Sequence, residues 1–119
     1  MKPIGTYSPF IKAGDTIYIS GQIALDADRG VLVSESVKAQ IEQTFKNLKS
    51  VVESAGATLS DIAKMTIYVA DLACYDEVNA VMQQYFSAPF PARALVEVSR
   101  LPKDALIEMD AIVVLTGSK

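Results

Sequence analysis

The chain has 119 residues, a formal net charge of −3 and a hydrophobic share of 50%. It contains no histidine and a single cysteine, which excludes Ser-His-Asp triads, Cys-His dyads, histidine-rich zinc sites and an internal disulfide. The sequence pI of about 4.8 and the absence of a basic stripe argue against nucleic acid as a partner.

Two short strands are predicted over residues 9–23, PFIKAGDTIYISGQI, joined by a turn at Gly14 and Asp15. The β-branched and aromatic residues of TIYI favour an extended conformation. Gly21 ends this run, and the DADRG segment at 26–30 is typical of a loop.

An amphipathic helix is predicted next, because apolar residues recur at steps of three and four. These residues are Val37, Ile41, Phe45, Leu48, Val52 and Ala55. Ser34 or Ser36 is suited to cap the start of the helix, and Gly56 is suited to the left-handed residue after its end. The charged residues between them lie off the apolar face, where water solvates them.

The second half of the chain predicts a strand at 64–69, a helix at 73–86, a proline-rich break, and strands at 92–98 and 106–115. The order β-β-α-β-α-β-β indicates an α+β fold, with one mixed sheet and both helices on one face. The other face then has no cover within the chain. Because the hydrophobic share is large for a small monomer, we expect partner subunits to cover that face.

Residues 1–119 are expected to form one domain, since the length suits a single core and no repeat or linker is visible. No stretch of 18 apolar residues and no signal-peptide pattern is present, so no membrane partner is expected. A lone Cys74 fits a reducing compartment. Together these features predict a cytoplasmic protein.

The stretch FPARALVEV at 90–98 places Arg93 inside an apolar, strand-like run. A guanidinium is always charged and is rarely buried without a partner. If the last two strands are antiparallel neighbours, alternation along them puts Arg93 and Glu108 on the same face of the sheet. Spacing alone therefore favours an ion pair within the chain, and a ligand carboxylate is the alternative.

Short segments along almost the whole chain resemble the RidA/YjgF family of reactive-intermediate deaminases. The strongest are PAR at 91–93, EVSRLP at 97–102 and IEMDA at 107–111, with further support from SGQI at 20–23, QTFKNLKSVVESAG at 43–56, DIAKMTIYVAD at 61–71 and EVN at 77–79. Each segment is weak alone, but their order and spacing together are specific.

The resemblance implies a chorismate-mutase-like fold in a homotrimer, with active sites in clefts between subunits. It also implies hydrolysis of enamine and imine intermediates such as 2-aminoacrylate, giving a 2-oxo acid and ammonia. The expected activity is that of a 2-iminobutanoate/2-iminopropanoate deaminase acting on a small carboxylate substrate. Neither a metal nor an organic cofactor is implied.

The resemblance also assigns roles to individual residues. Arg93 matches the family arginine that receives the substrate carboxylate, and Glu108 matches the residue that handles water or its proton. Tyr7 matches a tyrosine that lines the cleft, with an ordinary surface or core tyrosine as the alternative. Gly21 lets the backbone approach a ligand, unless it is a simple turn glycine. Asn79 lines the pocket, or it is a helix-surface asparagine.

The sequence departs from the family pattern at Leu95, where cysteine is frequent, and at Asp110, where glutamate is usual. Without a thiol, covalent chemistry at position 95 is excluded. We expect Leu95 to make the substrate pocket more apolar and to favour a larger substrate side chain. Cys74 is remote from these segments and is expected to be a packing residue.

Two other functions remain compatible with these residues. A binding protein of the same fold would use Arg93 to hold 2-oxo acids or other small carboxylates without turnover. An endoribonuclease, an activity ascribed to some members of this family, is the second alternative, and the acidic pI argues against it.

Overall fold

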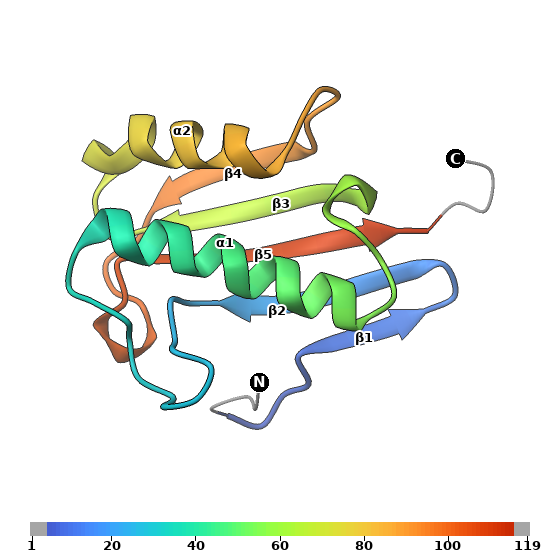
Figure 1. The fold of residues 1–119 in the computed structure, drawn as a ribbon, viewed down its shortest axis with the longest axis horizontal. Coiled ribbons are helices and arrows are strands. Elements are labelled where there is room, and N and C mark those ends of the chain that lie inside the picture. The colour runs from blue at the N-terminus through green and yellow to red at the C-terminus, as the bar shows by residue number, and fades with distance from the viewer. Residues whose placement is uncertain (1–4, 116–119) are drawn as a thin grey trace.

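The computed structural model describes residues 5–115, which form one mixed sheet and two α-helices (Figure 1). The strands are β1 (Phe10–Ala13), β2 (Thr16–Gln22), β3 (Ile62–Val69), β4 (Ala92–Glu97) and β5 (Ile107–Val114). The helices are α1 (Val37–Ser54) and α2 (Tyr75–Tyr85), and short 3-10 helices occur at η1 (Leu59–Asp61), η2 (Leu72–Cys74) and η3 (Pro102–Asp104). The predicted order of strands and α-helices is confirmed.

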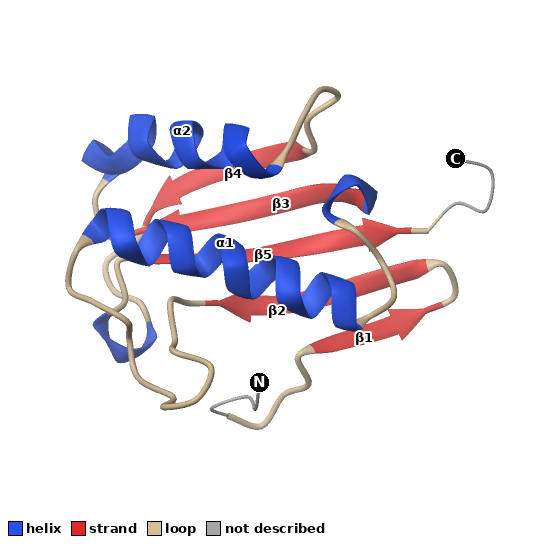
Figure 2. Ribbon diagram, viewed as in Figure 1, coloured by secondary structure: helices blue, strands red, loops and turns tan. Residues whose placement is uncertain are grey.

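The sheet has the strand order β1-β2-β5-β3-β4. Neighbouring strands are antiparallel except β3 and β4, which run parallel because α2 crosses between them as a β-α-β unit. Both helices pack on one face of the sheet (Figure 2). The predicted α+β class with a one-sided helix layer is therefore confirmed.

The predicted pairing of the last two strands is wrong. Among the described strands, β4 pairs only with β3, at the edge of the sheet, whereas β5 lies between β2 and β3. Arg93 is in register with Met65, a core residue beneath the helices, and Glu108 is in register with Tyr68. Arg93 therefore lies on the helix face and Glu108 on the opposite face. An ion pair between them within one chain is excluded.

The main core lies between the sheet and α1, as the apolar pattern predicts. Phe45 is fully buried and stacks on Tyr85 of α2, with ring centroids 5.4 Å apart. The ends of α1 also match the prediction. The Ser36 hydroxyl accepts a hydrogen bond from the Ala39 N–H at 3.3 Å, and Gly56 adopts a φ of +89° just after the helix.

α1 also buries polar side chains that its apolar pattern does not reveal. The Asn47 amide donates to the carbonyl oxygens of Ile23 and Leu25 at 2.9 and 3.0 Å, and so holds the segment that follows β2. The Gln40 side-chain oxygen accepts from the Leu106 N–H at 2.8 Å, one residue before β5. Leaving such a buried group without its partner costs about 1–3 kcal/mol. These two amides tie α1 to the segment after β2 and to the residue before β5.

The sheet face opposite the helices carries exposed apolar side chains. Ile11, Tyr18 and Val96 are 57%, 51% and 42% exposed on β1, β2 and β4. A smaller core lies under the loops at one end of this face and is made by Ile23, Leu25, Leu101 and Ala105. Within residues 5–115, neither α-helix is both long and apolar enough to cross a bilayer.

Candidate functional site

The guanidinium of Arg93 is held by one face of α2. Its Nη1 donates to Asn79 Oδ1 at 2.7 Å and approaches Met82 Sδ at 3.5 Å. Its Nη2 lies 3.5 Å from the Tyr75 hydroxyl, and Arg93 Cζ lies 5.6 Å from the centre of the Tyr75 ring. Residues 75, 79 and 82 fall on one side of a helix, so their spacing lets all three reach the same cation. α2 thereby orients the arginine of the edge strand β4.

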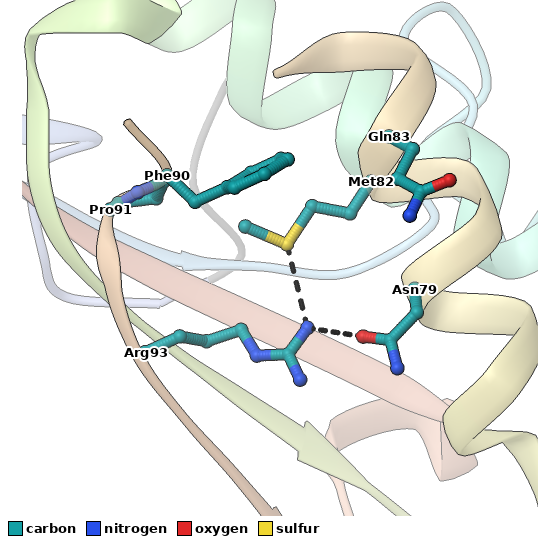
Figure 3. A pocket seen from close by; sticks show the side chains of 6 residues that line it. All are labelled: Asn79, Met82, Gln83, Phe90, Pro91 and Arg93. Carbon is teal, nitrogen blue, oxygen red and sulfur yellow. Dashed lines mark hydrogen bonds between the residues drawn. The ribbon is translucent and has the colours of Figure 1, made fainter. Parts of the chain in front are cut away.

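A pocket opens beside this arginine (Figure 3). It has a volume of about 280 Å³ and is lined by Asn79, Met82, Gln83, Phe90, Pro91 and Arg93. The Phe90 ring and the Met82 side chain extend toward each other from opposite sides, and the Arg93 guanidinium closes one end of the pocket (Figure 3). The cavity thus combines apolar walls with a positive charge.

No carboxylate among residues 5–115 lies within ion-pair distance of Arg93. The other arginine of this half of the chain, Arg100, pairs with Asp104 at 2.6 Å on the surface. A guanidinium presents a planar fork of donors that matches a carboxylate, and the Arg93 contacts within the chain are all to neutral groups. The pocket is therefore suited to a small carboxylate ligand.

Glu108 and Gly21 meet on the other face of the sheet because β2 contains a bulge. Ile19 is opposite Ala111 and Gln22 is opposite Met109, so β2 has one residue more than β5 between these pairs. A Cβ built on Gly21 would lie 2.9 Å from Glu108 Cδ and would overlap the carboxylate. The Glu108 carboxylate therefore occupies the space that a Cβ at position 21 would need. The predicted contact between the Gly21 backbone and a ligand stays a prediction.

The environment of Glu108 changes its acidity. The side chain is partly buried, and this loss of solvation raises the pKa of Glu108, with the negative charge of Asp110 as the second cause. The Tyr68 hydroxyl donates to Asp110 Oδ2 at 3.2 Å. Burial, followed by the charge of Asp110, also raises the pKa of Tyr68. A carboxyl group that keeps its proton to a higher pH than an ordinary glutamate is suited to act as a general acid as well as a general base.

The remaining predicted site residues lie elsewhere. Tyr7 is 46% exposed and precedes β1. Its segment is held to the bulge because the Ser20 hydroxyl donates to the Ser8 carbonyl and the Ser20 N–H donates to the Pro9 carbonyl. Leu95 packs against the main core and does not line the pocket, so the apolar walls come from other residues.

The structure thus brings the predicted residues together in two groups that lie on opposite faces of the sheet. Arg93 and Asn79 form the first group, and Gly21 and Glu108 form the second. The sequence reasoning missed Tyr75, Met82 and Phe90. The spacing of residues 75, 79 and 82 in the sequence places them on one side of a helix. It could not identify them as contacts of Arg93, because the sequence does not show that α2 packs beside β4. In the described part of the chain, no three Cys, Asp or Glu side chains are grouped as metal ligands.

Comparison with known proteins identifies the family. The model described as Endoribonuclease L-PSP matches residues 1–115. A RutC family protein of Pyrococcus abyssi is 48% identical over 111 residues, which is 93% of this chain and 87% of that protein. A human protein named 2-iminobutanoate/2-iminopropanoate deaminase is 40% identical over 111 residues, which is 93% of this chain and 81% of that protein.

A solved structure agrees with these sequence matches. The crystal structure of RidA from the Antarctic bacterium Psychrobacter has a TM-score of 0.92 and 40% sequence identity to this chain. The match covers 96% of this chain and 92% of that one. The chain belongs to the Endoribonuclease L-PSP family, which is the RidA/YjgF family.

Proposed function

We propose that this protein hydrolyses 2-imino acids and their enamine tautomers to 2-oxo acids and ammonia. The observation that carries the proposal is the Arg93 guanidinium, which α2 holds at the end of a pocket without a carboxylate partner among the described residues. Relatives at 40% identity named 2-iminobutanoate/2-iminopropanoate deaminase support the same reaction.

The reaction needs both groups of residues, and they lie on opposite faces of one chain. We therefore place the active site between two copies, with Arg93 and Asn79 from one and Glu108, Gly21 and Tyr7 from the next. The exposed apolar face at Ile11, Tyr18 and Val96 supplies the contact surface, and a homotrimer closes the arrangement with identical interfaces.

In this site the substrate carboxylate binds the Arg93 fork, which fixes the adjacent C=N carbon. Glu108 removes a proton from water as the oxygen attacks that carbon, and returns this proton to the nitrogen to give a carbinolamine. Glu108 then takes the hydroxyl proton and passes it to the amine, so that ammonia leaves as the C–N bond breaks and the C=O bond forms. For an enamine, a protonated Glu108 first delivers a proton to the terminal carbon, and its raised pKa favours that form.

Ammonia release tests the proposal. An amino-acid oxidase generates the imino acid, and the purified protein should accelerate formation of ammonia and the 2-oxo acid. Arg93→Ala should lower kcat/KM by roughly 30-fold or more, because losing one partner of a desolvated charge pair typically costs about 2–5 kcal/mol. Arg93→Lys should also fail substantially, since a point charge does not reproduce the fork.

Arg29→Ala is the matched control, because Arg29 is exposed in the loop after β2. It should leave kcat/KM unchanged. Binding of 2-oxo acids without any ammonia release by the wild type would instead indicate a carboxylate-binding protein. If Arg93→Ala unfolds the protein while ligand binding in the remaining folded fraction is unchanged, Arg93 is structural and the proposal is wrong.

An endoribonuclease is the second candidate, because the matching family model carries that description. The net charge of −3 opposes binding to a phosphate backbone. RNA cleavage that co-purifies with the protein and falls in Arg93→Ala would support it. Cleavage that survives Arg93→Ala and follows a contaminating fraction would dismiss it.

A further inference from the structure

We propose that the pocket beside Arg93 is a side-chain subsite that selects 2-imino acids with extended apolar side chains over the smallest members of the class. This inference rests on the proposed function, because it takes Arg93 as the anchor of the substrate carboxylate. It assigns the selectivity to Phe90 and Met82, and no longer to Leu95 as the sequence suggested, because Leu95 packs against the core.

The size of the pocket is the first argument. Its volume of about 280 Å³ has room for roughly nine groups the size of a water molecule, at about 30 Å³ each. It therefore approaches the size of pockets that hold drug-sized ligands, about 300 Å³ and above. An imino acid with a methyl side chain leaves most of this space unfilled.

The chemistry of the walls is the second argument. Beyond the guanidinium, the lining is formed by the Phe90 ring, the Pro91 ring and the Met82 thioether, with Gln83 beside them (Figure 3). Asn79 directs its oxygen to Arg93, so it is already engaged. A charged substrate side chain would lose hydration against these walls and would meet only the neutral amides of Gln83 and Asn79 as further polar partners. An aliphatic or aromatic side chain gains contact area there.

The state of Phe90 is the third argument. Phe90 lies beside the Arg93 guanidinium and is 51% exposed, so it still has apolar surface that a ligand can bury. Each buried methylene is worth about fourfold in affinity. A branched four-carbon side chain should therefore bind at least about tenfold more tightly than a methyl group, even when its burial is incomplete.

Calorimetric binding of 2-oxo acids, the proposed products, tests this inference without requiring turnover. Pyruvate, 4-methyl-2-oxopentanoate and 2-oxoglutarate share the carboxylate anchor and differ in the side chain. We expect 4-methyl-2-oxopentanoate to bind the wild type about tenfold or more tightly than either of the other two. Equal affinities, a preference for pyruvate or 2-oxoglutarate, or no binding of any of them would overturn the inference.

Variants then assign the preference to its residue. Phe90→Ala should reduce the preference to about threefold or less while pyruvate affinity stays the same, and Phe90→Leu should retain most of it. Val31→Ala is the control, because it also removes an exposed apolar side chain, far along the chain from the pocket. A preference that persists in Phe90→Ala contradicts the assignment.

The two proposals fail in different ways. Selective binding without ammonia release would contradict the deaminase proposal and support the subsite. Ammonia release without selective binding would support the deaminase proposal and contradict the subsite.

Discussion

At the scale of single residues, the environment of Arg93 explains why a charge occurs in an apolar strand. The edge position of β4 leaves its helix-facing side open to α2, whose Asn79 and Tyr75 stabilise the cation without neutralising it. A neutral partner keeps the charge available for a ligand. A carboxylate at position 79 would not.

This difference yields a prediction for Asn79→Asp. The substitution is nearly isosteric and places a carboxylate where Oδ1 now lies 2.7 Å from Arg93 Nη1. The new ion pair should maintain the thermal unfolding temperature, yet weaken 2-oxo acid binding by about tenfold, because the guanidinium is already paired. Calorimetry and thermal unfolding measure the two effects. An Asn79→Asp variant that binds 2-oxo acids as tightly as the wild type would show that Arg93 is not the carboxylate anchor.

Glu108 has a prediction of its own, which concerns pH. If ionised Glu108 activates water, kcat should fall as the pH drops through the pKa of Glu108. Because burial and Asp110 raise that pKa above the ordinary 4.5, the acid limb should lie at a higher pH than an ordinary glutamate gives. Glu108→Gln should lower kcat and remove this limb, while 2-oxo acid binding stays nearly intact.

Asp110→Asn serves as the matched variant for the same measurement. It removes the neighbouring negative charge but keeps an oxygen for the Tyr68 hydroxyl. The pKa of Glu108 should therefore fall, and the acid limb should move to lower pH with little change in the plateau. A pH profile identical in wild type and Glu108→Gln would assign the titration to another group.

At the scale of elements, the bulge in β2 connects local backbone geometry to the site. The extra residue brings Gly21 against Glu108, and the buried Asn47 and Gln40 of α1 hold the chain next to β2 and β5. These contacts hold the backbone that follows Gly21 and the backbone that precedes Glu108. The apolar stripe of α1 was predictable from spacing, whereas the partners of its buried amides were not.

Two glycine substitutions distinguish a loss of activity caused by displacing Glu108 from one caused by a less stable fold. Gly21→Ala introduces a methyl group that overlaps the movable Glu108 carboxylate, so kcat should fall by about tenfold or more while the fold survives. Gly30→Ala meets no atom within 4 Å but has a φ of +68°, so it should cost about 1 kcal/mol of unfolding free energy and leave kcat unchanged. Chemical denaturation and the ammonia assay measure the two effects. Equal losses of activity in both variants would contradict a role for Gly21 in placing Glu108.

At the scale of the whole molecule, the uncovered sheet face is the basis on which we propose assembly. A helix layer on one side leaves Ile11, Tyr18 and Val96 exposed on the other, and a sheet face with exposed apolar side chains favours an interface. The same face carries Glu108, on the side of the sheet away from Arg93. Assembly and activity should therefore be lost together.

Light scattering tests this expectation. The wild type should be a trimer at micromolar concentration, and Tyr18→Lys should split it and abolish ammonia release while circular dichroism remains that of a folded protein. Val31→Lys, in a loop rather than on the sheet, is the control and should leave the trimer intact. A wild type that is a stable monomer and still releases ammonia would sink both the trimer and the interfacial site.

The sequence by itself determined the elements and the faces they bury. Alternation along β5 and steps of three and four along α1 assign each residue to a side, because strand and helix periods are local properties of the backbone. The capping role of Ser36 and the left-handed conformation of Gly56 were predictable for the same reason. The family resemblance then singled out Arg93 and Glu108.

Only the tertiary structure decided which strands are neighbours. The strand order in turn decides on which face of the sheet Arg93 and Glu108 lie. Periodicity assigns the residues of one strand to two faces. It does not show which face of one strand lies on the same side of the sheet as a given face of another, because strand pairing joins segments that are remote in sequence. α2 carries β4 across to run parallel beside β3, and β5 enters the sheet on the other side of β3. The long-range pairing therefore places Arg93 under α2 and Glu108 on the uncovered face.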